Sequence, residues 1–327
     1  MSSADKNVCR FDHFMQHALH DPSTGYYTRN IQTVGASGDF STTATLSNLL
    51  GKAIAHHAIK WQQQFKTPLN LIEIGGGDGS LANSVIQSLP LVKRWKCNYH
   101  LVESSFTLTK KQQESKKLSK KITWHSDMQS ALENCHGVAF IFSNELVDAF
   151  PVRIFQHTNN SSTWKELHID GLNEILCETD HLPESSSFIT YKHSPQQRIE
   201  VHESYHDWLI SWRKYWKQGL MLTVDYGDIH PNIYYRMPKG TLRAYSHHQH
   251  ITGKAVYQNP GKQDITADVN FTDLIQWGDK LNLKTLSLIS QNELLTPFAT
   301  DKPEDQFLIH PDGAGSAFKA LLQQCDE

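Results

Sequence analysis

Two hydrophobic rhythms run along this chain of 327 residues. Short and almost continuous apolar runs predict buried strands at residues 69–74, 99–103, 122–125, 138–143, 220–224 and 284–289. Helical spacing of apolar positions predicts helices at residues 11–19, 45–65, 205–216, 271–281 and 317–324. Buried strands that alternate with helices are typical of a parallel sheet covered on both faces, so we predict an α/β, Rossmann-like fold.

Two segments depart from that rhythm. Between residues 152 and 203, short alternating runs joined by the polar segment 159–162 indicate an antiparallel hairpin inserted into the core. Residues 228–264 have little regular pattern, and loops of that length in a compact protein are usually functional or disordered. Because this segment is rich in Tyr, His, Arg and Asn, we interpret it as an active-site loop.

These patterns divide the chain into four parts. We expect an N-terminal helical cap or lid, a first part of the α/β core, an antiparallel insertion, and a second part of the core that carries the loop at residues 228–264. Their boundaries are residues 1–65, 66–151, 152–203 and 204–327.

The composition is that of an ordinary soluble protein, with 39% hydrophobic and 20% charged residues. A net charge of −3 gives no overall field that favours nucleic acid or an anionic membrane, so we expect neither as a partner. The five cysteines are scattered without a C-x-x-C motif, which indicates reduced thiols. The first residues lack the apolar core of a signal peptide, and no apolar run reaches the ~18 residues of a membrane span, so we predict a cytoplasmic location.

The most informative segment for chemistry lies where the first predicted strand of the sheet ends. Glu73 stands near the end of that strand, and Gly75, Gly77 and Gly79 follow at alternate positions. Glycine lets the backbone turn sharply and approach a ligand without a Cβ atom in the way. The dinucleotide fingerprint requires Gly or Ala where this chain has Ser80, which disfavours a nicotinamide dehydrogenase. An acid before the glycines suits a cationic head group such as that of S-adenosylmethionine, which we predict as the cofactor.

Three further acids are candidates for the same pocket. Glu103 ends the next strand, at the position where nucleotide-binding α/β folds bond the ribose hydroxyls. Asp127 follows the third strand and is placed to meet the adenine amine. Asp39 lies in a glycine-flanked segment and either contacts the cofactor or caps the long helix that follows. The alternative is a glycine-rich turn beside an unrelated surface Glu103.

Motifs spread over nearly the whole chain are specific in combination. They are Gly25-Tyr26-Tyr27, Gly38-Asp39-Phe40-Ser41-Thr42, the glycine run, Asn144-Glu145-x-x-Asp148-Ala149-x-Pro151, Asp225-Tyr226-Gly227, Thr241-Leu242-Arg243-Ala244-Tyr245 and Pro260-Gly261-x-x-Asp264-Ile265-Thr266. Together they resemble the MidA-like S-adenosylmethionine-dependent methyltransferases, a family that includes a mitochondrial complex I assembly factor that methylates protein arginine. The chain departs from the family at residues 43–45, which lack its usual Pro and Glu, and at Gly76, where the family usually has proline. The resemblance implies a class I methyltransferase sheet and a protein arginine acceptor.

A cationic guanidinium acceptor needs carboxylates that hold it and orient a nitrogen lone pair. Asn144, Glu145 and Asp148 follow the fourth strand at the carboxyl edge of the sheet, where ligands bind in open α/β folds. We predict Glu145 as the main acceptor ligand, assisted by Asp148 and Asn144. The alternative is that Asp148 caps the following turn and Glu145 only bonds backbone amides.

The long loop supplies two candidate substrate-binding residues, Tyr245 and His248. His247, His248 and His250 cluster there, but no Cys or carboxylate completes a known zinc spacing, so we predict no metal site. We expect a protein or peptide acceptor; the oligomeric state stays open. Two other functions also stay open, namely methylation of a small molecule or peptide, and cofactor binding by an assembly factor without catalysis.

Overall fold

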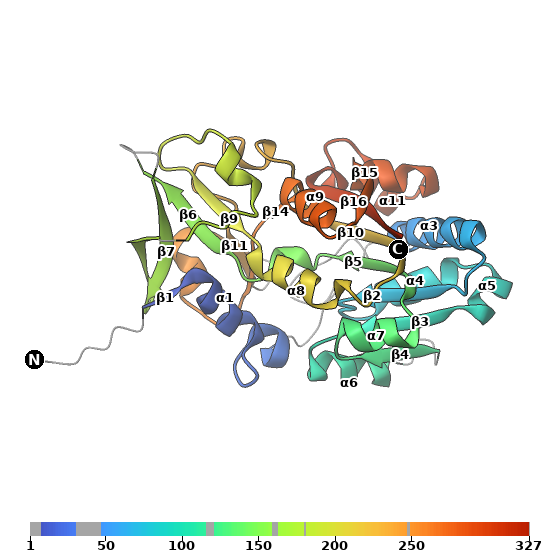
Figure 1. The fold of residues 1–327 in the computed structure, drawn as a ribbon. Coiled ribbons are helices and arrows are strands. Elements are labelled where there is room, and N and C mark those ends of the chain that lie inside the picture. Colours follow the sequence, from blue (N-terminus) through green and yellow to red (C-terminus); the bar gives the residue numbers. More distant parts are fainter. Residues whose placement is uncertain are drawn as a thin grey trace, which may run out of the picture. The chain divides into compact units, whose positions relative to one another are not determined.

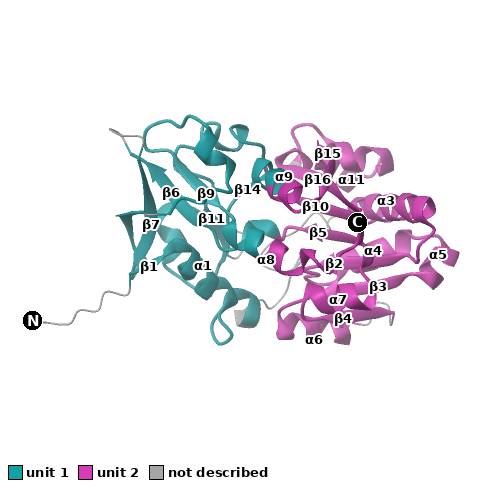
Figure 2. Ribbon diagram, in the orientation of Figure 1, with its two compact units in different colours: residues 1–32, 147–207, 228–276 teal, residues 33–146, 208–227, 277–327 magenta. Residues whose placement is uncertain are grey.

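The computed structural model describes residues 8–30, 47–115, 121–158, 163–179, 181–246 and 249–326. The chain forms two compact units, each built from three separate segments (Figure 2). Unit 1 contains residues 1–32, 147–207 and 228–276, and unit 2 contains residues 33–146, 208–227 and 277–327.

This division differs from the expected four parts. Residues 1–65 do not form one cap, because the first helix belongs to unit 1 whereas the helix that ends at Phe65 belongs to unit 2. The insertion at residues 152–203 lies in unit 1 together with residues 228–276, which the sequence had assigned to the core. Burial explains the first difference, since the apolar stripe of the second helix packs into the core around the main sheet.

Unit 2 is organised around that sheet, whose strands run in the order β15-β16-β10-β5-β2-β3-β4 (Figure 1). The strands are β2 (Asn70–Ile74), β3 (Asn98–Val102), β4 (Ile122–His125), β5 (Val138–Asn144), β10 (Gln218–Asp228), β15 (Lys284–Ser290) and β16 (Phe318–Asp326). β2, β3, β4, β5 and β10 pair in parallel, as predicted from their continuous apolar sequence. The carboxyl ends of β2 and β5 therefore meet at one edge, with Ile74 opposite Ser143.

The predicted helix at residues 317–324 is wrong. Phe318, Leu321, Leu322 and Cys325 have the spacing of a helix face, yet this segment is β16, which pairs antiparallel with both β10 and β15. A short apolar run that is buried on both faces does not separate a strand from a helix by periodicity alone.

Helices cover the sheet of unit 2. They are α3 (Leu49–Phe65), α4 (Ser80–Ser88), α5 (Leu91–Lys96), α6 (Phe106–Glu114), α7 (Met128–Asn134), α10 (Gln291–Leu295) and α11 (Pro303–Ile309), with the short turns η6 (Thr296–Phe298) and η7 (Ala314–Ala317). α3 and α4 pack closely, because a Cβ atom added at Gly51 would lie 2.1 Å from the Ser84 hydroxyl oxygen.

Unit 1 contains two antiparallel sheets. The larger has the order β1-β7-β6-β9, with β8 paired to β7, which confirms the predicted hairpin. Its strands are β1 (Val8–Arg10), β6 (Arg153–His157), β7 (Trp164–Asp170), β8 (Asn173–Glu178) and β9 (Arg198–Val201). The smaller sheet joins β11 (Arg243–Ser246) to β12 (Gln249–Ile251) and β13 (Asp264–Thr266). The segment at residues 228–264, expected to be a loop, thus contains most of a small sheet.

The remaining elements are helices and turns, together with one two-residue strand. Unit 1 holds α1 (Phe11–His20), η1 (Tyr26–Asn30), η2 (Val147–Ala149), η3 (Ser187–Thr190), η4 (Asn232–Tyr234), η5 (Gly253–Tyr257) and the two-residue strand β14 (Val269–Asn270). Two helices, α8 (Glu203–Arg213) and α9 (Phe271–Lys280), begin in unit 1 and end in unit 2. The helices predicted at residues 11–19, 205–216 and 271–281 are confirmed within a few residues.

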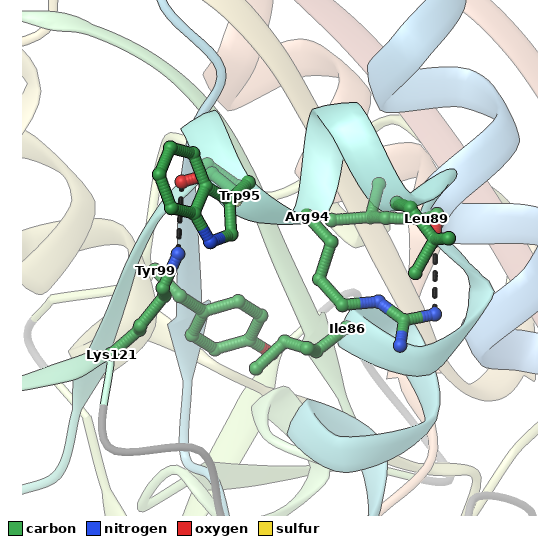
Figure 3. Close-up of a pocket in the computed structure, with 8 residues that line it drawn as sticks. Ile86, Leu89, Arg94, Trp95, Tyr99 and Lys121 are labelled. Carbon is green, nitrogen blue, oxygen red and sulfur yellow. Dashed lines mark hydrogen bonds between the residues drawn. The ribbon is translucent and has the colours of Figure 1, made fainter.

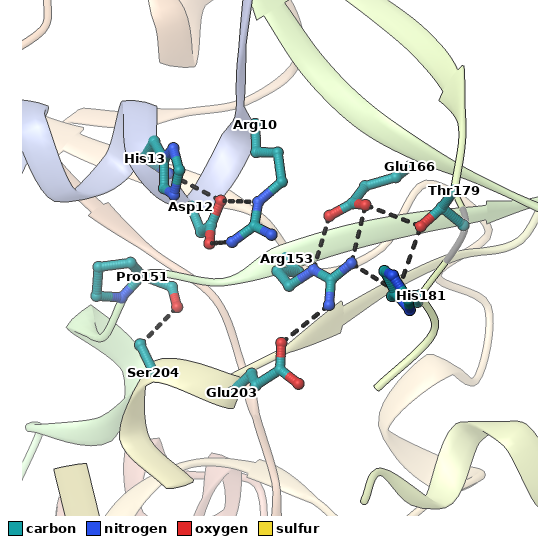
Figure 4. Close-up of polar contacts among 10 residues, drawn as sticks. All are labelled: Arg10, Asp12, His13, Pro151, Arg153, Glu166, Thr179, His181, Glu203 and Ser204. Atoms are coloured by element: carbon teal, nitrogen blue, oxygen red, sulfur yellow. Dashed lines mark hydrogen bonds and ion pairs between the residues drawn. The ribbon is translucent and has the colours of Figure 1, made fainter. Parts of the chain in front are cut away.

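A buried ion-pair cluster ties the larger sheet of unit 1 together (Figure 4). The guanidinium of Arg153 on β6 donates two hydrogen bonds to the Glu166 carboxylate on β7, at 2.7 and 2.9 Å. The same guanidinium donates to a Glu203 oxygen at 2.9 Å and to the His181 carbonyl at 2.8 Å. Only 8% of the Arg153 side chain and 5% of that of Glu166 are exposed, so neither charge has water as a substitute partner.

We predict that Arg153→Ala destabilises the protein by roughly 3–5 kcal/mol, because it leaves the Glu166 carboxylate buried and uncompensated. The measurement is the free energy of unfolding in urea. Lys165→Ala is the matched control: it breaks the exposed ion pair with Glu178 and should cost no more than about 1 kcal/mol. Equal losses for the two variants would contradict this account of the cluster.

Candidate active site

The glycine run forms a tight turn between β2 and α4. Gly75, Gly77 and Gly79 have φ angles of 71°, 53° and 80°, in the left-handed region that side chains with a Cβ atom rarely adopt. The Gly79 amide donates to the Gly76 carbonyl at 2.8 Å, which closes the turn. A Cβ atom at Gly75 would lie 2.9 Å from a methyl carbon of Leu146, so the chain after β5 packs directly against this turn.

Glu73 lies on β2 beneath this turn and is 2% exposed. The hydroxyl of Tyr99 on β3 donates to one of its oxygens at 2.5 Å. Burial raises the pKa of the Glu73 carboxyl to about 8, and the hydrogen bond from Tyr99 offsets only part of that rise. A buried carboxyl group with a raised pKa is suited to bind a cation, because a positive charge beside it would stabilise its ionised form.

Glu103 follows β3 and is linked to the glycine turn by a buried glutamine. Its carboxylate accepts the Ser105 amide at 2.9 Å and the Gln112 side-chain amide at 3.4 Å. The Gln112 amide also donates to the Gly77 carbonyl at 2.9 Å, while its oxygen accepts the Trp124 indole N–H at 3.1 Å. Burial raises the pKa of Glu103, and these hydrogen bonds lower it in part. The sequence analysis missed Gln112, because a mid-helix glutamine carries no signal of such a role.

Asp127 is the N-cap of α7 in this structure. One of its oxygens accepts the Ser130 amide at 2.8 Å, and the other accepts the hydroxyls of Ser126 and Ser130, both at 3.0 Å. These hydrogen bonds hold the pKa of Asp127 below its usual value, the one from the Ser130 amide contributing most. Its contact with adenine stays a prediction.

Asn144 ends β5 beside the glycine turn, and Glu145 follows it directly. Glu145 has a φ of 51°, a left-handed conformation that is uncommon for a residue with a long side chain. The Asn144 side-chain amide donates to a Glu145 oxygen at 3.0 Å, while the side-chain oxygen of Asn144 is buried with no hydrogen-bond partner among the described residues. Such strained residues and unpaired acceptors occur preferentially at functional sites.

The fully buried carboxylate of Asp225 holds this turn. Asp225, on β10, accepts the Leu146 amide at 3.1 Å and its neighbour Tyr226's amide at 2.9 Å. The Glu145 amide donates to the Val224 carbonyl at 3.0 Å. The ends of β5 and β10 are thereby joined, and the conformation of Glu145 follows from that junction.

Asp148 lies in unit 1, in η2, and does not share a helix with Glu145. Its carbonyl accepts the Ala267 amide at 3.1 Å. Nearby, the Tyr27 hydroxyl donates to Asp264 at 2.6 Å. Burial raises the pKa of Tyr27 well above its usual value, and the charges of Asp264 and Asp148 raise it further. Three of the sequence motifs therefore meet in unit 1, a meeting that no local pattern predicts.

Of the remaining predicted site residues, the structure describes only Tyr245. Tyr245, on β11 of unit 1, accepts the Arg243 guanidinium at 3.0 Å, and Arg243 also pairs with Asp268. Asp39 and His248 lie outside the described residues, as does His247. Among the described residues, no group of three or more His, Cys, Asp or Glu side chains is arranged to hold a metal ion. In the same part of the chain, no helix is both long and apolar enough to cross a membrane.

Comparison with known proteins identifies the class. Residues 50–289 match the model of a family described as "Putative S-adenosyl-L-methionine-dependent methyltransferase". This match covers more than half of the chain, so the chain belongs to this family. The predicted family and cofactor class are confirmed by it. The site fits the cofactor, because three left-handed glycines leave the backbone open and two buried acids lie beside it.

Individual relatives agree with this class. The chain is 28% identical to the zebrafish protein named "Protein arginine methyltransferase NDUFAF7, mitochondrial", over 80% of this chain and 66% of the relative. It is 25% identical to the human protein of the same name, over 96% of this chain and 75% of that protein. The matched part thus spans about two thirds of the first relative's length.

A solved structure has the same fold. A Burkholderia thailandensis protein, described as a "likely methyl transferase" and bound to S-adenosyl-homocysteine, superposes with a TM-score of 0.83 at 22% identity. The alignment covers 98% of this chain and 88% of that protein, which confirms the predicted class I methyltransferase fold. The predicted cytoplasmic location is contradicted by the relatives, whose names place them in mitochondria, and it is withdrawn.

We predict that Gly77→Val abolishes binding of S-adenosylhomocysteine while the protein stays folded. A β-branched side chain at a φ of 53° strains the turn whose shape the bound ligand requires in this assignment. Calorimetry on the folded variant is the measurement. Gly171→Val is the matched control, since Gly171 also has a positive φ of 62° but lies in unit 1 with open space around it. Normal affinity in Gly77→Val would contradict the assignment of the glycine turn.

We also predict that S-adenosylhomocysteine binding releases protons at pH 7. With a pKa of about 8, free Glu73 is mostly protonated at this pH, and the ligand ammonium favours its ionised form. Affinity should therefore rise as the pH increases towards 8. Calorimetry in buffers with different ionisation enthalpies measures the proton count.

Two variants test the origin of these protons. Glu73→Gln should remove the pH dependence, whereas Glu200→Gln should retain it. Glu200 is a suitable control because it is a buried carboxyl of unit 1 whose pKa is raised to about 7. Proton release that persists in Glu73→Gln would exclude Glu73 as its source.

Proposed function

We propose that this protein methylates a guanidinium nitrogen of arginine in a protein acceptor, with S-adenosylmethionine as the methyl donor. The observation that carries the proposal is the pair formed by Asn144 and Glu145. A carboxylate and a buried, unpaired acceptor oxygen stand side by side next to the glycine turn. A guanidinium, with several N–H donors and a positive charge, is complementary to that pair.

The names of the relatives support the same acceptor, since several are called protein arginine methyltransferases at 24–28% identity. In this proposal the glycine turn, Glu73 and Glu103 hold the donor, and the bound donor supplies an electrophilic methyl group on sulfonium. Glu145 accepts N–H hydrogen bonds from the guanidinium, and Asn144 accepts one more through its unpaired oxygen. This leaves one nitrogen lone pair directed at the methyl group, a positioning role that lowers the barrier of a displacement.

Proton balance follows from the same residues. The attacking nitrogen forms the new N–C bond as the C–S bond breaks, and the sulfur retains the electron pair. The methylated guanidinium then sheds one N–H proton, for which the Glu145 carboxylate is the proposed first acceptor. The acceptor roles of Asp148, Tyr245 and His248 stay predictions, as does the contact of Asp39 with the cofactor. Asp39 and His248 lie outside the described residues.

We predict that Glu145→Gln keeps its affinity for S-adenosylhomocysteine but methylates at least about a hundredfold more slowly. The substitution preserves shape and removes the charge that holds and orients the cation, an effect confined to the transfer step. The assay uses labelled donor with cell lysate to find the methylated species, and then that species as purified substrate. Asp148→Asn should be milder, and Glu114→Gln, at an exposed position of α6, should be neutral.

Four results would change the proposal. A wild-type rate in Glu145→Gln would favour a neutral acceptor, and loss of ligand binding would assign Glu145 to the donor pocket. Label found on a small molecule instead of protein would favour the alternative substrate class. Binding of S-adenosylhomocysteine without any labelled product would favour the non-catalytic assembly factor.

A further inference from the structure

Unit 2 exposes a cluster of large apolar side chains on the short helix α5. Leu91, Val92 and Trp95 are 77%, 67% and 81% exposed. Apolar side chains scattered singly over a surface need no explanation, but three in five consecutive residues form a patch. We call the patch with its adjoining cavity the α5 surface.

A cavity of about 170 Å³ lies beside this helix (Figure 3). Its lining is mostly apolar and consists of Ile86, Leu89, Leu91, Arg94, Trp95, Cys97, Tyr99 and Lys121. An apolar cavity of ~150 Å³ in another protein accommodates benzene, so this one has room for a single Phe or Leu side chain.

The charges around the cavity have one sign. α5 carries Lys93, Arg94 and Lys96 and no acid, and Lys121 lies across the cavity from Arg94. The Lys121 ammonium donates to the Trp95 carbonyl at 2.9 Å and lies 5.4 Å from the centre of its ring, while the Arg94 guanidinium donates to the Leu89 carbonyl at 3.2 Å. These contacts hold both cations beside the cavity, and among the described residues no carboxylate lines it.

The α5 surface lies at the edge of the sheet opposite the glycine turn. α4 begins at that turn and runs back over nine residues before α5 starts, and α5 leads directly into the amino end of β3. Lys121 likewise precedes the amino end of β4. A molecule on this surface would therefore leave the carboxyl edge, with Glu73, Glu103 and Glu145, accessible.

We propose that the α5 surface binds an acidic segment of a partner protein that inserts one Phe or Leu side chain into the cavity. The apolar cavity accounts for the inserted side chain, and the cationic rim accounts for carboxylates on either side of it. Binding to an anionic membrane would require protruding apolar side chains and a basic surface. It would not require a cavity of the size of one side chain. The concave lining between Trp95 and Tyr99 therefore favours a peptide segment.

The test uses a fluorescently labelled short peptide with a central Leu-Phe pair flanked on both sides by Asp and Glu. Anisotropy with the full chain should give binding at least about tenfold tighter than for two control peptides. One control has Lys in place of the acids, and the other has Ser in place of Leu-Phe. Added salt should weaken binding, because the charge contribution is exposed to solvent.

Variants locate the binding. Trp95→Ser combined with Lys96→Glu should lose at least about tenfold in peptide affinity, and S-adenosylhomocysteine affinity should stay unchanged as a check of folding. Phe307→Ser is the matched control, because it removes a 56% exposed aromatic residue of unit 2 on α11 and should retain peptide binding.

Three outcomes would overturn the proposal. The first is equal affinity for the three peptides or equal loss in the two variants. The second is Trp95-dependent binding to phosphatidylserine vesicles without any preference among peptides. The third is a Trp95-dependent dimer in sedimentation experiments that the acidic peptide does not compete with, which would assign the α5 surface to a second copy of the chain.

Discussion

The buried carboxylate of Asp225 is the interaction on which the candidate site depends. It accepts the amides of Leu146 and Tyr226 and so holds the turn after β5 against the neighbouring parallel strand β10. With the Leu146 amide held there, Glu145 must turn through a left-handed conformation, and Leu146 packs against Gly75. One carboxylate thereby fixes the position of the Asn144–Glu145 pair relative to the glycine turn. Unpairing such a buried group is costly, so these hydrogen bonds stabilise the turn in this conformation.

Electrostatics in the donor half of the site follows from burial. Glu73 and Glu103 are both almost inaccessible to water, and burial raises the pKa of each carboxyl. Their described partners are neutral donors: the Tyr99 hydroxyl, the Ser105 amide and the Gln112 amide. A cationic ligand that reaches Glu73 favours the ionised form of this carboxyl and is attracted by the negative charge that results. The same electrostatic attraction would let the site discriminate between the cationic donor and neutral molecules of similar shape.

Much of this fold was predictable because the central strands β2, β5 and β10 are buried along most of their length. The apolar runs of β2, β5 and β10 favour a parallel sheet, and the glycine turn with its two acids follows from them in sequence order. The same burial made β16 unpredictable, since its apolar residues also have helical spacing. Contacts between segments far apart in the sequence could not be predicted either. The hydrogen bond between Tyr27 and Asp264 joins positions 237 residues apart, and Gln112 gains its role only when α6 packs beneath the glycine turn.

The specificity of the motif from Asn144 to Pro151 has a structural reason. One segment of unit 2 ends at Leu146 and the chain returns to unit 1 at Val147, so the motif crosses one of the boundaries between the two units. Its first half is fixed by Asp225 and Gly75 of unit 2, whereas its second half is fixed in unit 1 by the amide of Ala267 and by a hydrogen bond between Ala149 and His20. The residues of the motif therefore contact different parts of the chain, and few substitutions preserve all of these contacts at once. A segment that makes contacts in both units, and that presents a carboxylate at a left-handed φ of 51°, therefore tolerates few substitutions.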